Sequence, residues 1–127
     1  MTLQLLIDGL PAIDIELLDD APKTRASLQK SLPLRSMVER WGDEIYFYVT
    51  FKAPLELGAR SKMKVGDVAY WPNGPALAIF FGPTPASKGK EPVAASECNV
   101  IGRINVSPDI LRGATEGAEV TLRRTAD

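Results

Sequence analysis

Aromatic side chains and one arginine are the residues of this sequence whose types and spacing could do chemistry. Arg40 ends one predicted strand, and the aromatic residues fall on neighbouring strands or at their ends: Trp41, Tyr46, Tyr48, Tyr70, Trp71, Phe80 and Phe81. An aromatic pocket with one arginine can hold a proline ring and bind an amide or a carboxylate. The alternative is that Trp41 and Trp71 fill the ends of a barrel while Arg40 is a solvated charge.

Histidine is absent from the 127 residues of the chain. This absence excludes Ser-His-Asp and Cys-His activation of a nucleophile by the usual base. It also excludes imidazole as a metal ligand and as a switch near neutral pH. Any acid–base chemistry therefore falls to carboxylates, lysine or tyrosine.

The remaining nucleophile and the carboxylates give weak signals. Cys98 is the single cysteine, so no intrachain disulfide can form, and without a neighbouring histidine an inert structural thiol is expected. The closest carboxylate pairs are Asp14 with Glu16 and Asp43 with Glu44, and nothing around them indicates a metal site or an acid–base dyad. We therefore expect neither a metal nor a cofactor.

Charge and hydropathy bound the partners. The net charge is −1, which predicts no general attraction to nucleic acid or to an acidic membrane. The N-terminus lacks the basic start of a signal peptide, and no apolar run approaches the roughly 20 residues that span a bilayer. We expect one cytoplasmic domain over residues 1–127, whose oligomeric state the sequence leaves unknown.

Alternation of apolar and polar residues predicts a mainly β protein. Residues 3–7 and 13–17 each alternate with period two and flank a turn, which predicts an antiparallel hairpin. Further strands are predicted at 36–40, 44–51, 65–71, 75–82, 99–106 and 118–124, with short helices at 19–32 and 107–113. Residues 82–97 read as a long connection. These elements favour an antiparallel β-barrel or sandwich with helices at its ends.

The strand at 44–51 carries two tyrosines on its predicted outer face. Ile45, Phe47 and Val49 would face the core, which leaves Tyr46 and Tyr48 outside. Strand propensity alone explains tyrosines there. An aromatic surface for a ligand is the alternative.

Three motifs in this order, "WGDEIYFYV", "VGDVAYWPNGPALAIFFGPTP" and "NVIGRI", resemble the small bacterial and archaeal cyclophilin-like family. The resemblance covers most of residues 3–125, and the middle motif is its most specific part. It implies a closed barrel of eight antiparallel strands capped by two short helices. It also implies the prolyl-isomerase site of true cyclophilins, which uses an arginine, apolar and aromatic residues, a glutamine and a histidine.

The resemblance carries over to this chain only in part. Phe80 or Phe81 is similar to the pocket phenylalanine, and Arg40 is the best match to the catalytic arginine. Cys98 and Asn99 stand near the place of the histidine. The ligand-binding residues expected on this basis are Trp41, Tyr46, Tyr48, Trp71, Asn73, Phe80, Phe81 and Asn99.

The function expected from these residues is binding of a proline-containing peptide or a small apolar ligand in an outer groove. Weak or absent peptidyl-prolyl isomerase activity is expected, because the histidine and the glutamine are missing. An active isomerase would require Arg40 to point into a groove lined by Tyr48 and Phe80 or Phe81. A self-associating structural domain is the third alternative.

Overall fold

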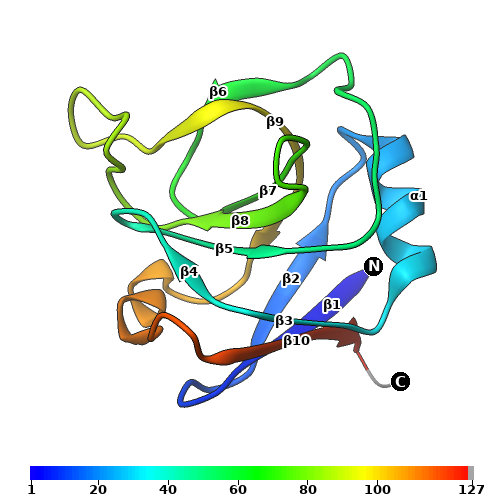
Figure 1. Ribbon diagram of the computed structural model, residues 1–127, viewed down its shortest axis with the longest axis horizontal. Helices are drawn as coiled ribbons and strands as arrows, with labels where there is room; N and C mark the ends of the chain where they lie inside the picture. The colour runs from blue at the N-terminus through cyan, green and yellow to red at the C-terminus, as the bar shows by residue number, and fades with distance from the viewer. Residues whose placement is uncertain (126–127) are drawn as a thin grey trace.

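The computed structural model describes residues 1–125 of the chain. Over these residues the chain forms one large antiparallel sheet with few helices (Figure 1). In chain order the elements are β1 (Thr2–Ile7), β2 (Ile13–Leu17), α1 (Pro22–Ser31), β3 (Leu34–Met37), β4 (Glu39–Arg40), β5 (Glu44–Tyr48), β6 (Arg60–Lys62), β7 (Asp67–Trp71), β8 (Ala76–Phe80), β9 (Val93–Ile104), the 3₁₀ helix η1 (Pro108–Gly113) and β10 (Glu119–Arg124).

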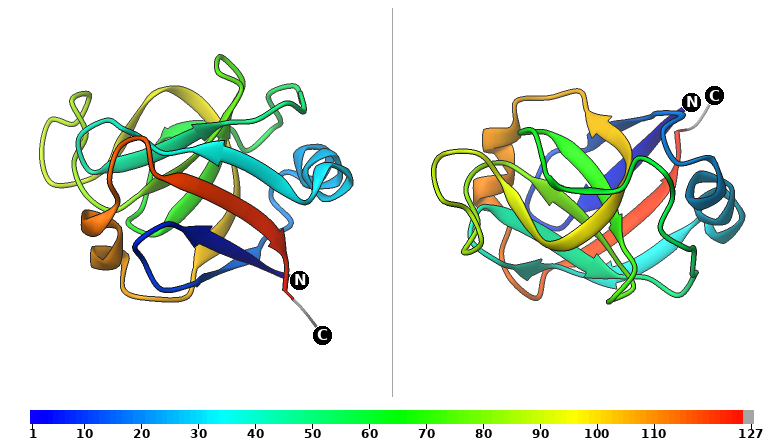
Figure 2. Two further views of the ribbon diagram at one scale, coloured as in Figure 1. Left: turned by 60° about the horizontal axis from the view of Figure 1, so that its bottom comes forward. Right: turned by 90° about the horizontal axis from the view of Figure 1, so that it is seen from above.

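The sheet is curled but does not close through backbone pairing, which corrects the expected eight-stranded barrel (Figure 2). Its strand order is β3-β10-β1-β2-β9-β7-β8-β5-β4, and β6 pairs with β9 outside this path. Within residues 1–125 no pairing joins β3 to β4 at the two ends of the order, although only Val38 separates them in the chain. Two helical segments lie where they were expected, at opposite sides of the sheet, but there is no closed barrel for them to cap.

Alternation sets the two faces of the sheet. The predicted hairpin is confirmed: β1 and β2 pair in antiparallel register, with Leu3 opposite Ile15. On the central strands the alternation separates two apolar clusters. In β7, Val68 and Tyr70 enter the main core, whereas Ala69 belongs to a smaller second cluster and Trp71 packs against it.

The second cluster forms because the chain returns over the outer face of β7 and β8. Residues 82–97 are not all connection, since β9 begins at Val93 and pairs with β6. This second cluster, called the small core from here on, is made of Met63, Ala69, Ala78, Phe80, Ala94, Cys98 and Val100. Central strands are therefore apolar on both faces, as for a sheet that is covered on both sides.

A bulge in β9 allows one long strand to serve both clusters. The register of β7 with β9 moves from Val68 opposite Gly102 to Ala69 opposite Val100, which leaves Ile101 as the additional residue. Ile101 is buried in the main core. Next to the bulge, the Cβ of any residue other than glycine at position 102 would lie 2.5 Å from the backbone oxygen of Glu16.

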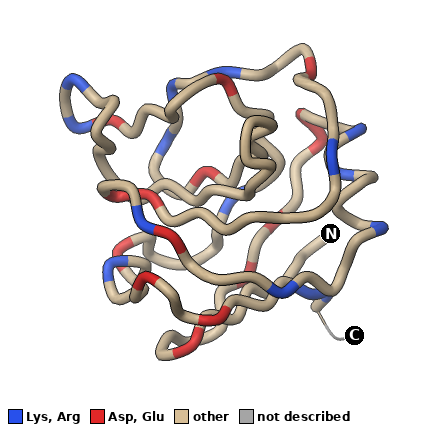
Figure 3. Tube along the Cα trace, viewed as in Figure 1, with Lys and Arg blue, Asp and Glu red and all other residues tan. Residues whose placement is uncertain are grey.

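Charged residues of both signs are interspersed along the trace rather than gathered on one side (Figure 3). Among the described residues, no helix is long and apolar enough to cross a membrane.

We predict that Gly102→Ala lowers the free energy of unfolding by about 1–3 kcal/mol, because β2 and β9 must separate to admit the methyl group. Gly89→Ala is the matched control, since a Cβ at position 89 meets no atom within 4 Å. Urea denaturation of the two variants tests this, and equal midpoints would show that β2 moves to admit the methyl group without loss of stability.

Candidate functional site

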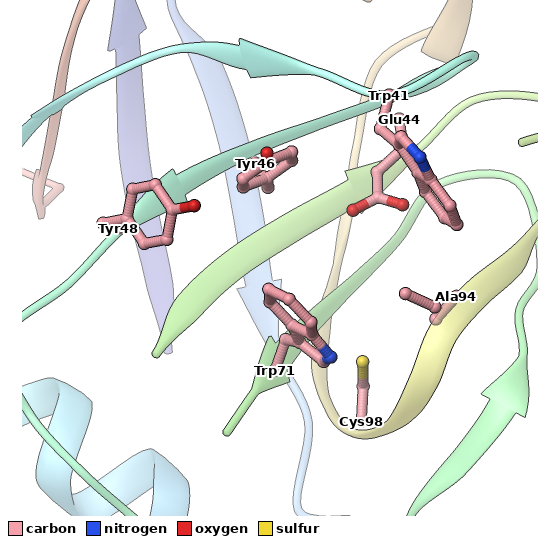
Figure 4. A pocket seen from close by; sticks show the side chains of 8 residues that line it. Trp41, Glu44, Tyr46, Tyr48, Trp71, Ala94 and Cys98 are labelled. Atoms are coloured by element: carbon pink, nitrogen blue, oxygen red, sulfur yellow. The ribbon is translucent and has the colours of Figure 1, made fainter. Parts of the chain in front are cut away.

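A pocket of about 210 Å³ opens at the edge of the small core (Figure 4). It lies between β5, β7 and the beginning of β9, with the turn before β5 closing one side. Half of its lining residues are aromatic and, among the described residues, none is arginine or lysine: Trp41, Glu44, Tyr46, Tyr48, Trp71, Ala94, Ala95 and Cys98. The structure therefore brings together four of the aromatic residues that the sequence marked as ligand-binding candidates.

Period-two alternation in β5 supplies three of the lining side chains. Glu44, Tyr46 and Tyr48 share one face of the strand, while Ile45 and Phe47 lie in the main core on the other face. The predicted faces of this strand are confirmed. The two tyrosine rings meet edge to face, with centroids 5.7 Å apart and planes at 88°. Tyr48 is 50% exposed and forms the outer rim of the pocket.

The indole of Trp71 is held in place from β9. Its Nε1 donates a hydrogen bond to the Ser96 hydroxyl oxygen at 2.6 Å. Asn73 does not line the pocket, but its Nδ2 donates to the same hydroxyl oxygen at 3.1 Å. Ser96 thus holds the Trp71 indole, and Asn73, which was expected to bind ligand, lies beside the pocket and shares this acceptor.

Glu44 is a residue of the site that the sequence marks only as a carboxylate beside Asp43, with no role assigned to it. Its side chain points among Trp41, Trp71 and Cys98 in Figure 4, and the residue is 7% exposed. Its Oε1 is buried and finds no hydrogen-bond partner within residues 1–125. Burial raises the pKa of this carboxyl from its ordinary value of 4.5 to about 8. One unused signal in the sequence is its spacing of two from Tyr46 on an aromatic strand.

Cys98 faces the same pocket as a thiol. Burial, and secondly the charge of Glu44, raise the pKa of Cys98 to about 12. At neutral pH such a group is not a nucleophile. Over residues 1–125, no group of three or more His, Cys, Asp and Glu side chains is placed to hold a metal ion.

Arg40 lies outside the pocket lining, which is not the arrangement that an active isomerase required. Its Nη1 donates to the carbonyl oxygen of Ala114 at 2.9 Å. Its guanidinium lies over the ring of Phe81, 5.2 Å from the centroid, and Arg112 lies over the same ring at 5.4 Å. Phe81 is buried in the main core and, like Arg40, does not line the pocket that contains Tyr48.

Phe80 and Asn99 are also engaged in the fold. Phe80 is fully buried in the small core beneath the pocket. Asn99 donates through Nδ2 to the hydroxyl oxygen of Thr24 and to the carbonyl oxygen of Pro54, both at 2.8 Å. Its Oδ1 accepts the backbone N–H of Glu56 at 2.8 Å. Asn99 therefore ties β9 to α1 and to the segment after β5 and does not line the pocket.

Comparison with known proteins places this geometry in context. The sequence model of a family described as cyclophilin-like matches residues 1–123. One similar solved structure is the solution structure of the hypothetical protein AF2241 from Archaeoglobus fulgidus. It is 38% identical, with a TM-score of 0.83, over 98% of this chain and 95% of that one. No curated protein matches the chain.

We predict that Glu44 makes stability fall with rising pH. Between its ordinary value of 4.5 and about 8, the folded protein keeps a proton that the unfolded chain has released. Rising pH within this window therefore favours unfolding. Relative to Glu44→Gln, the wild type should lose on the order of a few kcal/mol between about pH 5 and about pH 8, with no further loss above.

Urea unfolding across this range measures the difference between the two proteins. Glu97→Gln is the control, because Glu97 is exposed on the same strand as Cys98. If the free energy of unfolding of the wild type and of Glu44→Gln changed in parallel with pH, Glu44 would have its ordinary pKa in the folded protein.

Proposed function

The chain belongs to the cyclophilin-like family, and on that premise we propose that its aromatic pocket binds a peptide or a small apolar ligand with weak or absent isomerase activity. The observation that carries the proposal is the convergence of four aromatic side chains from separate parts of the chain on one pocket. Trp41 precedes β5, Tyr46 and Tyr48 belong to it, and Trp71 ends β7. Aromatic rings at a surface supply a large contact area with specific geometry.

The dimensions of the pocket favour a small group over a long segment. Its volume of about 210 Å³ lies below the range of about 300–1,000 Å³ typical of drug-sized ligands. A proline ring, another single side chain or a compact head group suits such a volume. The remainder of a peptide would lie along the exposed rim at Tyr48.

The engagement of Arg40 supports binding without efficient catalysis. Prolyl isomerisation must cross a barrier of about 20 kcal/mol, and the family resemblance implies an arginine that favours the twisted amide. Here the Arg40 side chain donates to Ala114 and packs on Phe81, outside the pocket lining. The carboxyl of Glu44 and the thiol of Cys98 are among the polar groups that line the pocket (Figure 4).

Tyr48→Ala should weaken binding of a blocked Ala-Pro dipeptide by about tenfold, because it removes one wall of the pocket. The fold should survive, since Tyr48 is 50% exposed. Met37→Ala on β3 is the matched control, because Met37 is 52% exposed and does not line the pocket. Isothermal titration calorimetry tests this, and equal affinities in the wild type and Tyr48→Ala would place the peptide elsewhere.

We expect the wild type to leave prolyl isomerisation of an Ala-Ala-Pro-Phe peptide at its uncatalysed rate, even at high protein concentration. The reason is that no arginine within residues 1–125 lines the pocket. A coupled protease assay or exchange NMR measures the rate. Acceleration that disappears in Tyr48→Ala would instead identify the pocket as an isomerase site.

A further inference from the structure

The Glu44 carboxyl is a polar group whose surroundings leave it unsatisfied. Its Oε1 is buried with no hydrogen-bond partner over residues 1–125, and the residue is more than nine-tenths buried. A buried polar atom without a partner is costly to a fold. The side chain nevertheless points into the pocket, where a bound molecule could reach it (Figure 4).

The groups that face Glu44 carry no positive charge. Tyr46 and Tyr48 on its own strand and Cys98 from β9 are the titratable neighbours that line the pocket with it. From β8 its register partner is Phe80, and β7 contributes the indole of Trp71. No lysine or arginine among the described residues lines the pocket.

Among the described residues, the charged neighbours just outside the lining are two carboxylates and Arg40, whose guanidinium donates to the carbonyl oxygen of Ala114 and lies over the ring of Phe81. Glu39 of β4 stands opposite Tyr46 in the sheet. Asp43 precedes Glu44 in the chain but accepts a bond from Arg112 Nη1 at 3.1 Å. The one charge that the pocket itself can develop is therefore negative.

The aromatic lining favours the same sign of ligand. The faces of indole and phenol rings are negative and attract cations, most strongly where water is excluded. Trp41, Trp71 and the tyrosines surround the space into which Glu44 points (Figure 4). An anion would meet both these faces and the carboxylate, whereas a compact organic cation would be complementary to both.

We propose that the ligand of this pocket presents a small organic cation, such as a methylated ammonium group, which pairs with the Glu44 carboxylate and packs against the aromatic rings. The inference rests on the proposed function, because it specifies the ligand class of the same pocket. The methyl groups supply the apolar contact that the rings require, and the charge supplies the partner that Glu44 lacks. A bound cation takes the ionised form of Glu44, so the carboxyl releases its proton to solvent on binding.

Choline and its neutral isostere 3,3-dimethyl-1-butanol test the inference, because they differ in charge and hardly in shape. Neither probe titrates near neutral pH, so any pH dependence belongs to the protein. With the pKa of Glu44 at about 8, choline should bind about tenfold more tightly at about pH 9 than at about pH 7. At about pH 9 it should also exceed the isostere by about tenfold or more.

The two tryptophans of the chain both line the pocket, so their fluorescence reports occupancy directly. Calorimetry at about pH 7 in buffers of different ionisation enthalpy should record release of about one proton per choline bound. Glu44→Gln should remove the pH dependence and the preference for choline, and leave the isostere bound. Glu97→Gln, an exposed carboxylate on β9, should behave as the wild type.

The outcomes separate this inference from the function on which it rests. Equal binding of choline and the isostere at about pH 9 would overturn the cation and leave apolar binding intact. Failure of choline, the isostere and the blocked Ala-Pro dipeptide alike would overturn both. Because the pH series and the proton count use the wild type, they decide the matter even if Glu44→Gln does not fold, which circular dichroism would reveal.

Discussion

Burial of the central strands on both faces is the constraint on which the rest of the structure depends. Side chains alternate across β7 and β8, so an apolar residue at nearly every position demands cover on each side. The main core covers one side, and β6 with the beginning of β9 covers the other. The bulge at Ile101 lets β9 contribute to both. The pocket lies at the edge of the small core, where β6 and the beginning of β9 no longer cover the sheet, so apolar side chains remain partly exposed there.

Polar contacts between distant segments keep this arrangement in register. Asn99 uses both the oxygen and the nitrogen of its side-chain amide to join β9 to α1 and to the segment after β5. Glu56 then accepts the backbone N–H groups of Lys23 and Thr24 at the start of α1, a helix whose N-cap Ala21 makes no side-chain bond. Ser96 holds Trp71 at the pocket itself. The aromatic walls are thus positioned by bonds made well outside the ligand's reach.

The sequence predicted the features that depend on local period. The first hairpin and the two faces of β5 follow from alternation, and the latter places Tyr46 and Tyr48 together. Closure of the barrel was wrong because it came from family likeness and not from pairing within this chain. The sequence could not predict the direction of the Arg40 side chain, because its hydrogen-bond acceptor is the carbonyl of Ala114, 74 residues away. Glu44 was named beside Asp43 but given no role, because a charged residue beside a turn is typical of a solvated surface and β9 buries it only through the fold.

The two apolar clusters lie on the same sheet but share no side chains, and they differ in how much apolar surface they bury. Within residues 1–125 the small core contains seven buried residues, whereas the main core contains 25. Regions with less buried apolar surface open at lower free energy than the whole molecule. We therefore expect the small core, and the pocket at its edge, to open locally at a lower free energy than the main core. An occupant that contacts Glu44 and the aromatic walls would oppose this local opening, and because it binds only the folded protein it would also stabilise the molecule as a whole.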